Sequence, residues 1–257
     1  MTDRSQTLLS ILWQPWLVRL GVIAMLLVGW EIVGRYSDAM IFAPPSRVFP
    51  AVVNIFRDPG VVNAVVLALW ELLIAFAISV LFGLLIGLAV GLSPFCRGAI
   101  YPIVLMLYSV PQAPLLPIFI LIFGIGAASK IAFGVSHGIF PVIITVAAGV
   151  QNIDVSLVRA ARSMGASQRQ ILTSIVFPFM IPSFFTGMRL AMTGVLLGVL
   201  LSELFVSIVG IGFYTRRFAD SFQPQNLFAL IFVLAAIAVT LNELCRRAEL
   251  RFSAWIA

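Results

Sequence analysis

Residues 154–182 read DVSLVRAARSMGASQRQILTSIVFPFMIP and form the only long polar interruption in the hydrophobic second half of the chain. This stretch is too polar to cross a bilayer. Its first part predicts a short helix over Val155 to Met164, because Asp154 is a favourable N-cap and Gly165 stands where a helix end favours positive φ. The stretch therefore begins with a helix that lies outside the membrane and ends at a sharp turn.

A second helix is predicted immediately after that turn. Ser167 and Gln170, three residues apart, have the spacing of a capping box, and the apolar run Ile171 to Phe177 supplies the body of the helix. Pro178 and Pro182 are expected to mark its end, because proline lacks a backbone donor. The predicted product is a loop of two short helices that carries Arg159, Arg162 and Arg169.

The composition of the whole chain predicts an all-α polytopic membrane protein. Of its 257 residues, 61% are hydrophobic and only 10% are charged, and the mean hydropathy is +1.12. A soluble globular domain carries fewer apolar and more charged residues. The net charge of +6 does not indicate nucleic acid as a partner, because the arginines are scattered between apolar runs. They are better explained as topology signals, and membrane lipid is the expected surrounding.

Six long apolar segments predict six transmembrane helices, since about 20 residues cross the hydrocarbon core as a helix. Placing both termini in the cytoplasm puts most of the Lys and Arg residues on the cytoplasmic side, which favours that orientation. The chain then divides into a cytoplasmic tail over 1–19, one transmembrane domain over 20–245 and a cytoplasmic tail over 246–257. The spans are expected at about 20–34, 62–92, 99–124, 131–150, 183–207 and 227–244, with a cytoplasmic loop over 151–182.

Regularly spaced glycines predict close helix packing in two of the spans. Gly83, Gly87 and Gly91 recur every four residues and therefore share one face of a helix. Such a face lets the backbone of a second helix approach unusually closely. Gly194 and Gly198 repeat the same spacing in the fifth span.

The third span is unusually rich in proline. So many missing donors predict a bent or interrupted helix, and a broken helix at membrane depth is tolerated only against protein or a water-filled cavity. This span is therefore a candidate lining of a transport path, with a proline-kinked packing helix as the alternative. Its prolines are Pro102, Pro111, Pro114 and Pro117.

A small set of side chains at membrane depth forms the candidate transport path. Ionisable groups there are costly and often functional. Glu71 and Glu203 are the deepest acids, and for each a place in the path and a buried hydrogen-bonding role within the bundle both stay open. His137 is expected to pack, since no carboxylate lies one helical turn away on its own span. The candidate path residues are Glu71, Ser109, Gln112, Met192 and Glu203.

The sequence contains no motif for catalysis or metal binding. It has no phosphate-binding loop of the form Gly-x-x-x-x-Gly-Lys-Ser/Thr, and the sole lysine, Lys130, lies at an expected outer helix end. Cys96 and Cys245 lie far from any Cys-x-x-Cys or His-rich spacing. We therefore expect no catalytic residue, no metal site and no cofactor in this chain. Any ATP-driven cycle requires a separate nucleotide-binding subunit.

The spacing within residues 154–178 resembles the signature of the inner-membrane permease subunits of binding-protein-dependent ABC importers. That signature reads Glu-Ala-Ala, three residues, Gly, nine residues, Ile, one residue, Leu-Pro. Here Arg159-Ala160-Ala161, Gly165, Ile175 and Phe177-Pro178 keep the spacing, with Arg159 in place of Glu and Phe177 in place of Leu. The turn Phe123 to Gly126, followed by Ser129-Lys130, is similar to that of the nitrate, sulfonate and taurine branch.

The resemblance implies a type I ABC importer permease fold in which the loop is a coupling helix that docks on an ATPase. It further implies two ATPase subunits that use ATP and Mg²⁺, a second permease subunit (expected as a homodimer) and an extracytoplasmic binding protein. The location would be the bacterial inner membrane, and the substrate a small organic acid, sulfonate, oxyanion or vitamin precursor. The implied coupling residues are Arg159, Ala160, Ala161, Arg162, Met164, Gly165, Ala166, Ile175 and Pro178.

Other functions also fit parts of the sequence. The loop alone fits an amphipathic helix that lies on lipid headgroups with its arginines reaching anionic lipid. The whole chain fits an ion-coupled secondary carrier or channel that works without an ATPase. In that case the loop should be dispensable, whereas Glu203 or Glu71 should be essential. A structural scaffold, the third alternative, would move no solute.

Overall fold

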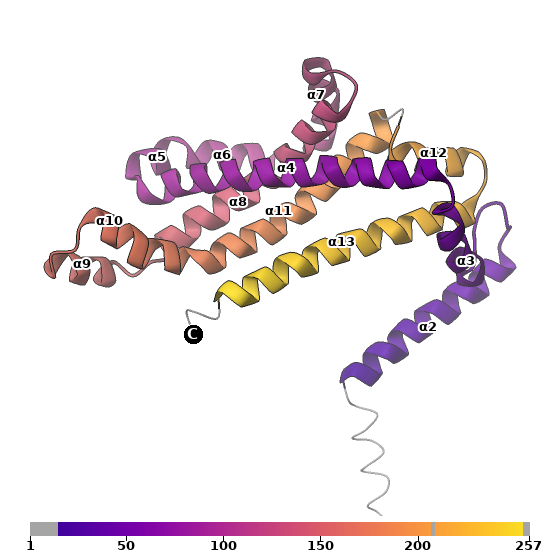
Figure 1. Ribbon diagram of the computed structural model, residues 1–257, viewed down its shortest axis with the longest axis horizontal. Helices are drawn as coiled ribbons and strands as arrows, with labels where there is room; N and C mark the ends of the chain where they lie inside the picture. The colour runs from indigo at the N-terminus through magenta and orange to yellow at the C-terminus, as the bar shows by residue number, and fades with distance from the viewer. Residues whose placement is uncertain (1–14, 207–208, 254–257) are drawn as a thin grey trace, which may run out of the picture. The chain divides into compact units, whose positions relative to one another are not determined.

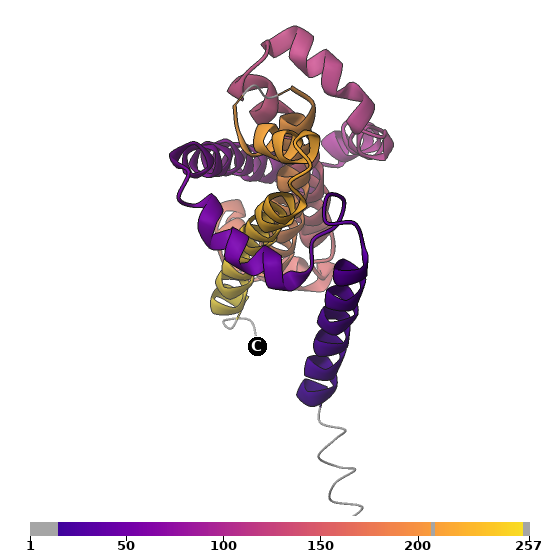
Figure 2. The ribbon, with the colours of Figure 1, turned by 90° about the vertical axis from the view of Figure 1, so that its right-hand side faces the viewer.

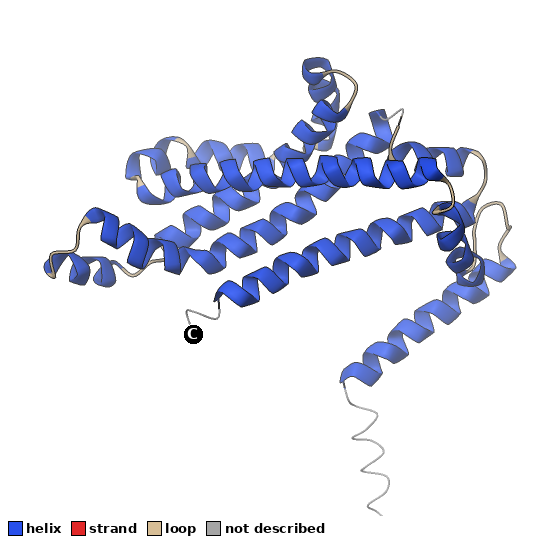
Figure 3. Cartoon of the chain, in the orientation of Figure 1, coloured by secondary structure: helices blue, strands red, loops and turns tan. Residues whose placement is uncertain are grey.

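The computed structural model describes residues 15–206 and 209–253, and within these ranges every regular element is a helix (Figure 3). This confirms the all-α prediction. Most of the predicted N-terminal tail and the last residues of the C-terminal tail lie outside the described residues. The helices are α2 (Pro15–Tyr36), α3 (Pro45–Ile55), α4 (Pro59–Leu92), α5 (Pro94–Ala99), α6 (Tyr101–Ser109), the 3₁₀ turn η1 (Ala113–Leu115), α7 (Leu116–Phe123), α8 (Ala127–Gln151), α9 (Val155–Ser163), α10 (Gln168–Ile171), the π-helical turn η2 (Leu172–Val176), α11 (Phe177–Val206), α12 (Ile211–Asp220) and α13 (Pro224–Ser253).

Five helices in the described part of the chain are long and apolar enough to cross a membrane, and the number rises to six if a bent pair of helices is counted as one span. The bent pair is Pro94–Ser109 with Ala113–Phe123, and its two parts meet at 92°. The predicted interruption of the proline-rich span is therefore confirmed, with the break beside Pro111. The five continuous spans are Trp16–Tyr36, Pro59–Leu92, Ala127–Gln151, Gln168–Phe205 and Pro224–Arg251.

The chain forms two compact units. Unit 1 comprises residues 1–59 and 214–233, and unit 2 comprises residues 60–213 and 234–257. In unit 1 a loop leads from α2 into α3 (Figure 2), and the Trp30 ring stacks on Phe232 with 5.5 Å between ring centroids. Unit 2 contains the loop 154–178 and all the candidate path residues.

The core of unit 2 depends on close contact between α4 and α8. Gly87 of α4 faces Val146 of α8, and a Cβ atom added to Gly87 would lie only 2.8 Å from the Val146 Cβ. The same relation holds one turn to either side, so the glycine face predicted from the sequence is confirmed. The facing pairs are Gly83 with Val142, Gly87 with Val146 and Gly91 with Val150.

α11 packs on α8 just as closely. A Cβ atom added to Gly194 would lie 2.6 Å from the His137 carbonyl oxygen, and one added to Gly198 would lie 2.9 Å from the Gly134 Cα. Figure 1 shows α8 and α11 side by side. α8 therefore lies at close range against both α4 and α11, because glycine stands at the points of contact.

Replacing Gly87 by alanine is expected to destabilise the protein by about 1–3 kcal/mol, the usual cost of overpacking a filled core. The added methyl group would meet both the Val146 side chain and, at 3.0 Å, the Ile143 carbonyl oxygen. Thermal unfolding of the purified protein in detergent measures the effect. Gly29→Ala is the matched control, because nothing lies within 4 Å of its added Cβ. Equal melting temperatures for the two variants would contradict the prediction.

The prediction that Pro178 and Pro182 end a short helix is wrong. Residues 168–205 form one continuous span in which Pro182 lies inside α11. The five-residue π-helical turn Leu172–Val176 directly precedes this part of α11. Such a turn changes the local bonding pattern, and membrane helices accept proline where neighbouring groups adjust. The loop is thus continuous with the fifth span instead of being separated from it.

Candidate coupling loop and transport path

The loop 154–178 has the local geometry that its sequence predicts. Asp154 Oδ1 accepts a hydrogen bond of 2.8 Å from the Ser156 amide at the start of α9. The Gln170 amide donates to Ser167 Oγ at 3.3 Å and the Ser167 amide donates to Gln170 Oε1 at 2.7 Å, which completes the capping box of α10. Between the two helices, Gly165 has a φ of 83°.

The cap on α9 depends on an ionised carboxylate. Hydrogen bonds from Ser156, chiefly from its backbone amide, hold the pKa of Asp154 below its usual value. A carboxylate with a lowered pKa in the folded protein contributes stability above its normal pKa and loses it as the pH falls through the lowered value. The cap is therefore fully formed at neutral pH.

One side of the loop is anchored in the apolar core of unit 2. Ala161 of α9 and Ile171 of α10 are 8% and 5% exposed, and they join a cluster that continues into α8 and α11. A force applied to α9 would therefore be passed to those two helices by direct packing. The cluster consists of Val142, Val146, Val150, Ile153, Ala161, Ile171, Val176, Met180 and Ala191.

The loop also contains a concave surface, which is formed in part by residues of the same cluster. Five of the implied coupling residues line it, and among them Met164 is 82% exposed. Arg159, Ala160 and Arg162 are exposed on α9, whereas Pro178 is half-buried in the continuous helix. The lining residues are Ala161, Met164, Gly165, Ala166, Gln170, Ile171, Ser174 and Ile175.

The structure brings two of the candidate path residues together at a lysine. Lys130 Nζ lies 3.1 Å from both carboxylate oxygens of Glu71 and 3.2 Å from Glu203 Oε1. Glu71, Lys130 and Glu203 are 2%, 3% and 0% exposed. Of the two roles left open for these acids, their burial and ion pairing favour the one within the bundle. Met192 is likewise buried, in an apolar cluster with Leu72.

The remaining path candidates, Ser109 and Gln112, lie at the break between α6 and α7. Ser109 is exposed and Gln112 is half-buried, with Gln112 Oε1 3.2 Å from the Ser136 hydroxyl of α8. Beside Ser136, the His137 ring packs edge-on against Phe133, and its Nδ1 lies 3.0 Å from the Phe133 carbonyl oxygen. The packing role expected for His137 fits these contacts. Sequence reasoning missed Ser136, because a lone serine in a span carries no distinctive pattern.

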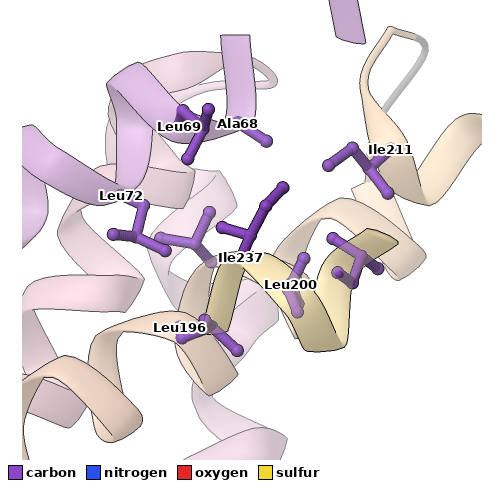
Figure 4. A pocket seen from close by; sticks show the side chains of 9 residues that line it. Ala68, Leu69, Leu72, Leu196, Leu200, Ile211 and Ile237 are labelled. Carbon is purple, nitrogen blue, oxygen red and sulfur yellow. The ribbon is translucent and has the colours of Figure 1, made fainter. Parts of the chain in front are cut away.

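A second hollow in unit 2 is lined by apolar side chains alone, as the close view shows (Figure 4). It offers no hydrogen-bonding group to a hydrophilic solute, so it is a poor candidate for the path. Residues of α4, α11, α12 and α13 surround it: Ala68, Leu69, Leu72, Leu196, Val199, Leu200, Ile211, Leu234 and Ile237.

Comparison with known families bears directly on these features. Residues 79–247 match the family described as "Binding-protein-dependent transport system inner membrane component". The chain belongs to this family. It is thus a multi-pass inner-membrane permease of a binding-protein-dependent importer and a non-enzymatic transporter subunit. The family is the one that the spacing within the loop resembles.

Relatives of this permease extend over most of its length. It is 30% identical over 246 residues to the taurine transport system permease protein TauC of Escherichia coli, covering 92% of this chain and 88% of TauC. It is 28% identical over 216 residues to the formylaminopyrimidine transport permease protein ThiX of Halalkalibacterium halodurans, covering 84% and 86% of the two chains. The nitrate import permease protein NrtB of a Synechocystis strain is 27% identical over 240 residues, covering 90% and 87%.

The fold of the permease is that of a type I ABC importer. A chain of the MetNI methionine ABC transporter, solved in inward-facing conformations, aligns with a TM-score of 0.57 at 20% identity. The alignment covers 77% of this chain and 96% of that one.

Proposed function

We propose that the permease forms the path for a small solute delivered by an extracytoplasmic binding protein, and that the loop 154–178 couples it to a separate ATPase. The observation that carries this proposal is that the concave surface of the loop and the core of unit 2 share residues. Ala161 and Ile171 belong to the core cluster and also line the concave surface, where Met164 is exposed. The N-caps and the turn at Gly165 fix the angle between the two helices, so a push on the concave surface reaches the spans.

The proposed assembly contains two ATPase subunits, which use ATP and Mg²⁺, and a second copy of the permease. The loop and both termini would face the cytoplasm. The relatives are named for taurine, formylaminopyrimidine and nitrate, all small polar solutes. We infer a substrate of comparable size: a small sulfonate, oxyanion, organic acid or vitamin precursor.

The break between α6 and α7 is the part of the chain that we assign to the path. Non-helical backbone at membrane depth must lie against protein or line a water-filled cavity. Ser109, Val110 and Pro111 are nevertheless exposed among the described residues of the single chain. A hydrated path, bordered by Ser109 and Gln112 and shared with the second permease subunit, meets that requirement.

Co-purification tests the coupling role. The tagged chain is solubilised from its native membrane in mild detergent, the proteins that accompany it are identified, and ATP hydrolysis is assayed. We expect a stoichiometric ATPase subunit with the wild type and its loss with Ala160→Trp, because Ala160 is exposed on α9. Ala127→Trp is the matched control, an equally exposed alanine at the far end of α8. A chain that purifies alone and still moves solute in liposomes would overturn the proposal.

A further inference from the structure

The three residues Glu71, Lys130 and Glu203, here called the charge cluster, join three helices of unit 2. Glu71 belongs to α4, Lys130 to the first turn of α8 and Glu203 to the last turn of α11. Each side chain is at most 4% exposed. Neither the coupling loop nor the break between α6 and α7 includes these residues, so the proposed function leaves the charge cluster without a role.

The charge cluster also contacts the backbone that leads into α12. The Gly212 amide donates to Glu203 Oε2 at 3.0 Å, and Lys130 Nζ lies 3.5 Å from the Val209 carbonyl oxygen. At Gly210 φ is +130°, and an added Cβ would lie 2.5 Å from Glu203 Oε1. The backbone of this segment therefore lies directly against the Glu203 carboxylate, and there is no room for a side chain at position 210.

Buried ion pairs of this kind constrain position more than they add stability. The cost of removing charges from water is offset only while each charge keeps its partners, and separating one member leaves an uncompensated buried charge. α4, α8, α11 and residues 209–212 can therefore move as one piece at low cost, whereas moving one of them alone is costly.

We propose that the charge cluster is a clamp that fixes residues 209–212, and with them the first turn of α12, to α4 and to the adjoining ends of α8 and α11. This end of unit 2 then moves as a single body in any conformational change of the permease. The clamp does not depend on the coupling role of the loop, because its contacts lie entirely among these four segments.

The two acids differ in their contacts, which makes the proposal testable. Glu203 contacts both Lys130 and Gly212, whereas Glu71 contacts Lys130 and the Glu203 carboxylate. Lys130 and Gly212 bond to different oxygens of Glu203, and a glutamine at 203 has an acceptor at only one of these two positions, because its other terminal atom is an amide donor. A glutamine at 71 leaves the Lys130–Glu203–Gly212 contacts in place. A clamp predicts unequal effects on residues 209–213, whereas a merely stabilising cluster predicts similar ones.

Hydrogen exchange of the purified full-length chain, followed by mass spectrometry on the peptide covering residues 209–213, measures the clamp directly. We expect Glu203→Gln to speed exchange of this peptide about tenfold or more, since a lost hydrogen bond to a charged group has that magnitude. Glu71→Gln should leave its exchange near the wild-type rate. Glu243→Gln is the control, the same change at an exposed acid paired with Arg246.

A second variant reaches the same contact without changing any charge. Gly210→Ala should push residues 209–212 away from Glu203 and speed the same exchange, even if Glu203→Gln does not fold. Unchanged exchange in a folded Glu203→Gln or Gly210→Ala protein would overturn the clamp. So would equal acceleration by Glu71→Gln. None of these readouts requires an ATPase, so failure of the coupling proposal would leave this test intact.

Discussion

Replacing Gly165 by proline should abolish ATP-driven uptake while leaving membrane insertion and the helix bundle intact. Gly165 has a φ of 83°, whereas the proline ring holds φ near −65°. Proline would also remove the amide that donates 3.0 Å to the Arg162 carbonyl oxygen. The turn would have to re-form with α9 at another angle to α10, so the concave surface would no longer match a partner shaped to it.

Uptake of labelled taurine, nitrate and a short sulfonate into proteoliposomes that contain the co-purified ATPase, with ATP on the ATPase side and the binding protein on the other, tests this expectation. Gly165→Asn is the matched control, because asparagine tolerates positive φ better than other residues. It should retain most of the uptake. Circular dichroism should show the same helix content for both variants. Normal uptake by a folded Gly165→Pro protein would count against the coupling role of the loop.

Replacing Lys130 by methionine should destabilise the protein by about 3–5 kcal/mol, the cost typical of breaking a buried ion pair from one side. The ammonium group is the direct partner of both Glu71 and Glu203, and its side chain is only 4% exposed. Methionine fills a similar volume, so the effect would come from the two carboxylates left facing each other without their cation.

A triple variant tests whether the destabilisation by Lys130→Met comes from the lost charge or from altered packing. Removing both acids as well, in the triple variant Lys130→Met, Glu71→Gln, Glu203→Gln, should recover much of the lost stability, because a neutral set requires no cation. Arg246→Met is the control, since its ion pair with Glu243 is 52% exposed on the arginine side. Thermal unfolding in detergent measures all three proteins. A triple variant as unstable as Lys130→Met would show that the lysine acts through packing instead.

Much of the structure of the loop 154–178 could be predicted because its signals are local. The caps at Asp154 and Ser167 and the positive φ at Gly165 each depend on residues within four positions along the chain. The glycine face of α4 was also predictable, because four-residue spacing alone places Gly83, Gly87 and Gly91 together. The sequence did not show which helix would meet that face.

The charge cluster could not be predicted, because it consists of contacts between residues that are distant in the sequence. Lys130 meets Glu71 and Glu203 across 59 and 73 residues of sequence, so no local pattern could join them. Opposite charges within the spans were the available signal, because an ionisable group at membrane depth usually finds a partner. Proline stops an isolated helix, so Pro178 and Pro182 predict a helix end. A single π-helical turn and the surrounding bundle override that preference.

The π-helical turn Leu172–Val176 also determines how far α10 is rotated about the helix axis relative to α11. Each residue of an α-helix advances the chain by about 100° around the axis. Adding or deleting one residue in this turn would rotate α10 and the preceding Gly165 turn by about that angle relative to α11. The concave surface would then point to a different side of the bundle. The direction in which the loop faces is therefore determined by the number of residues in one turn, independently of the side chains that line the loop.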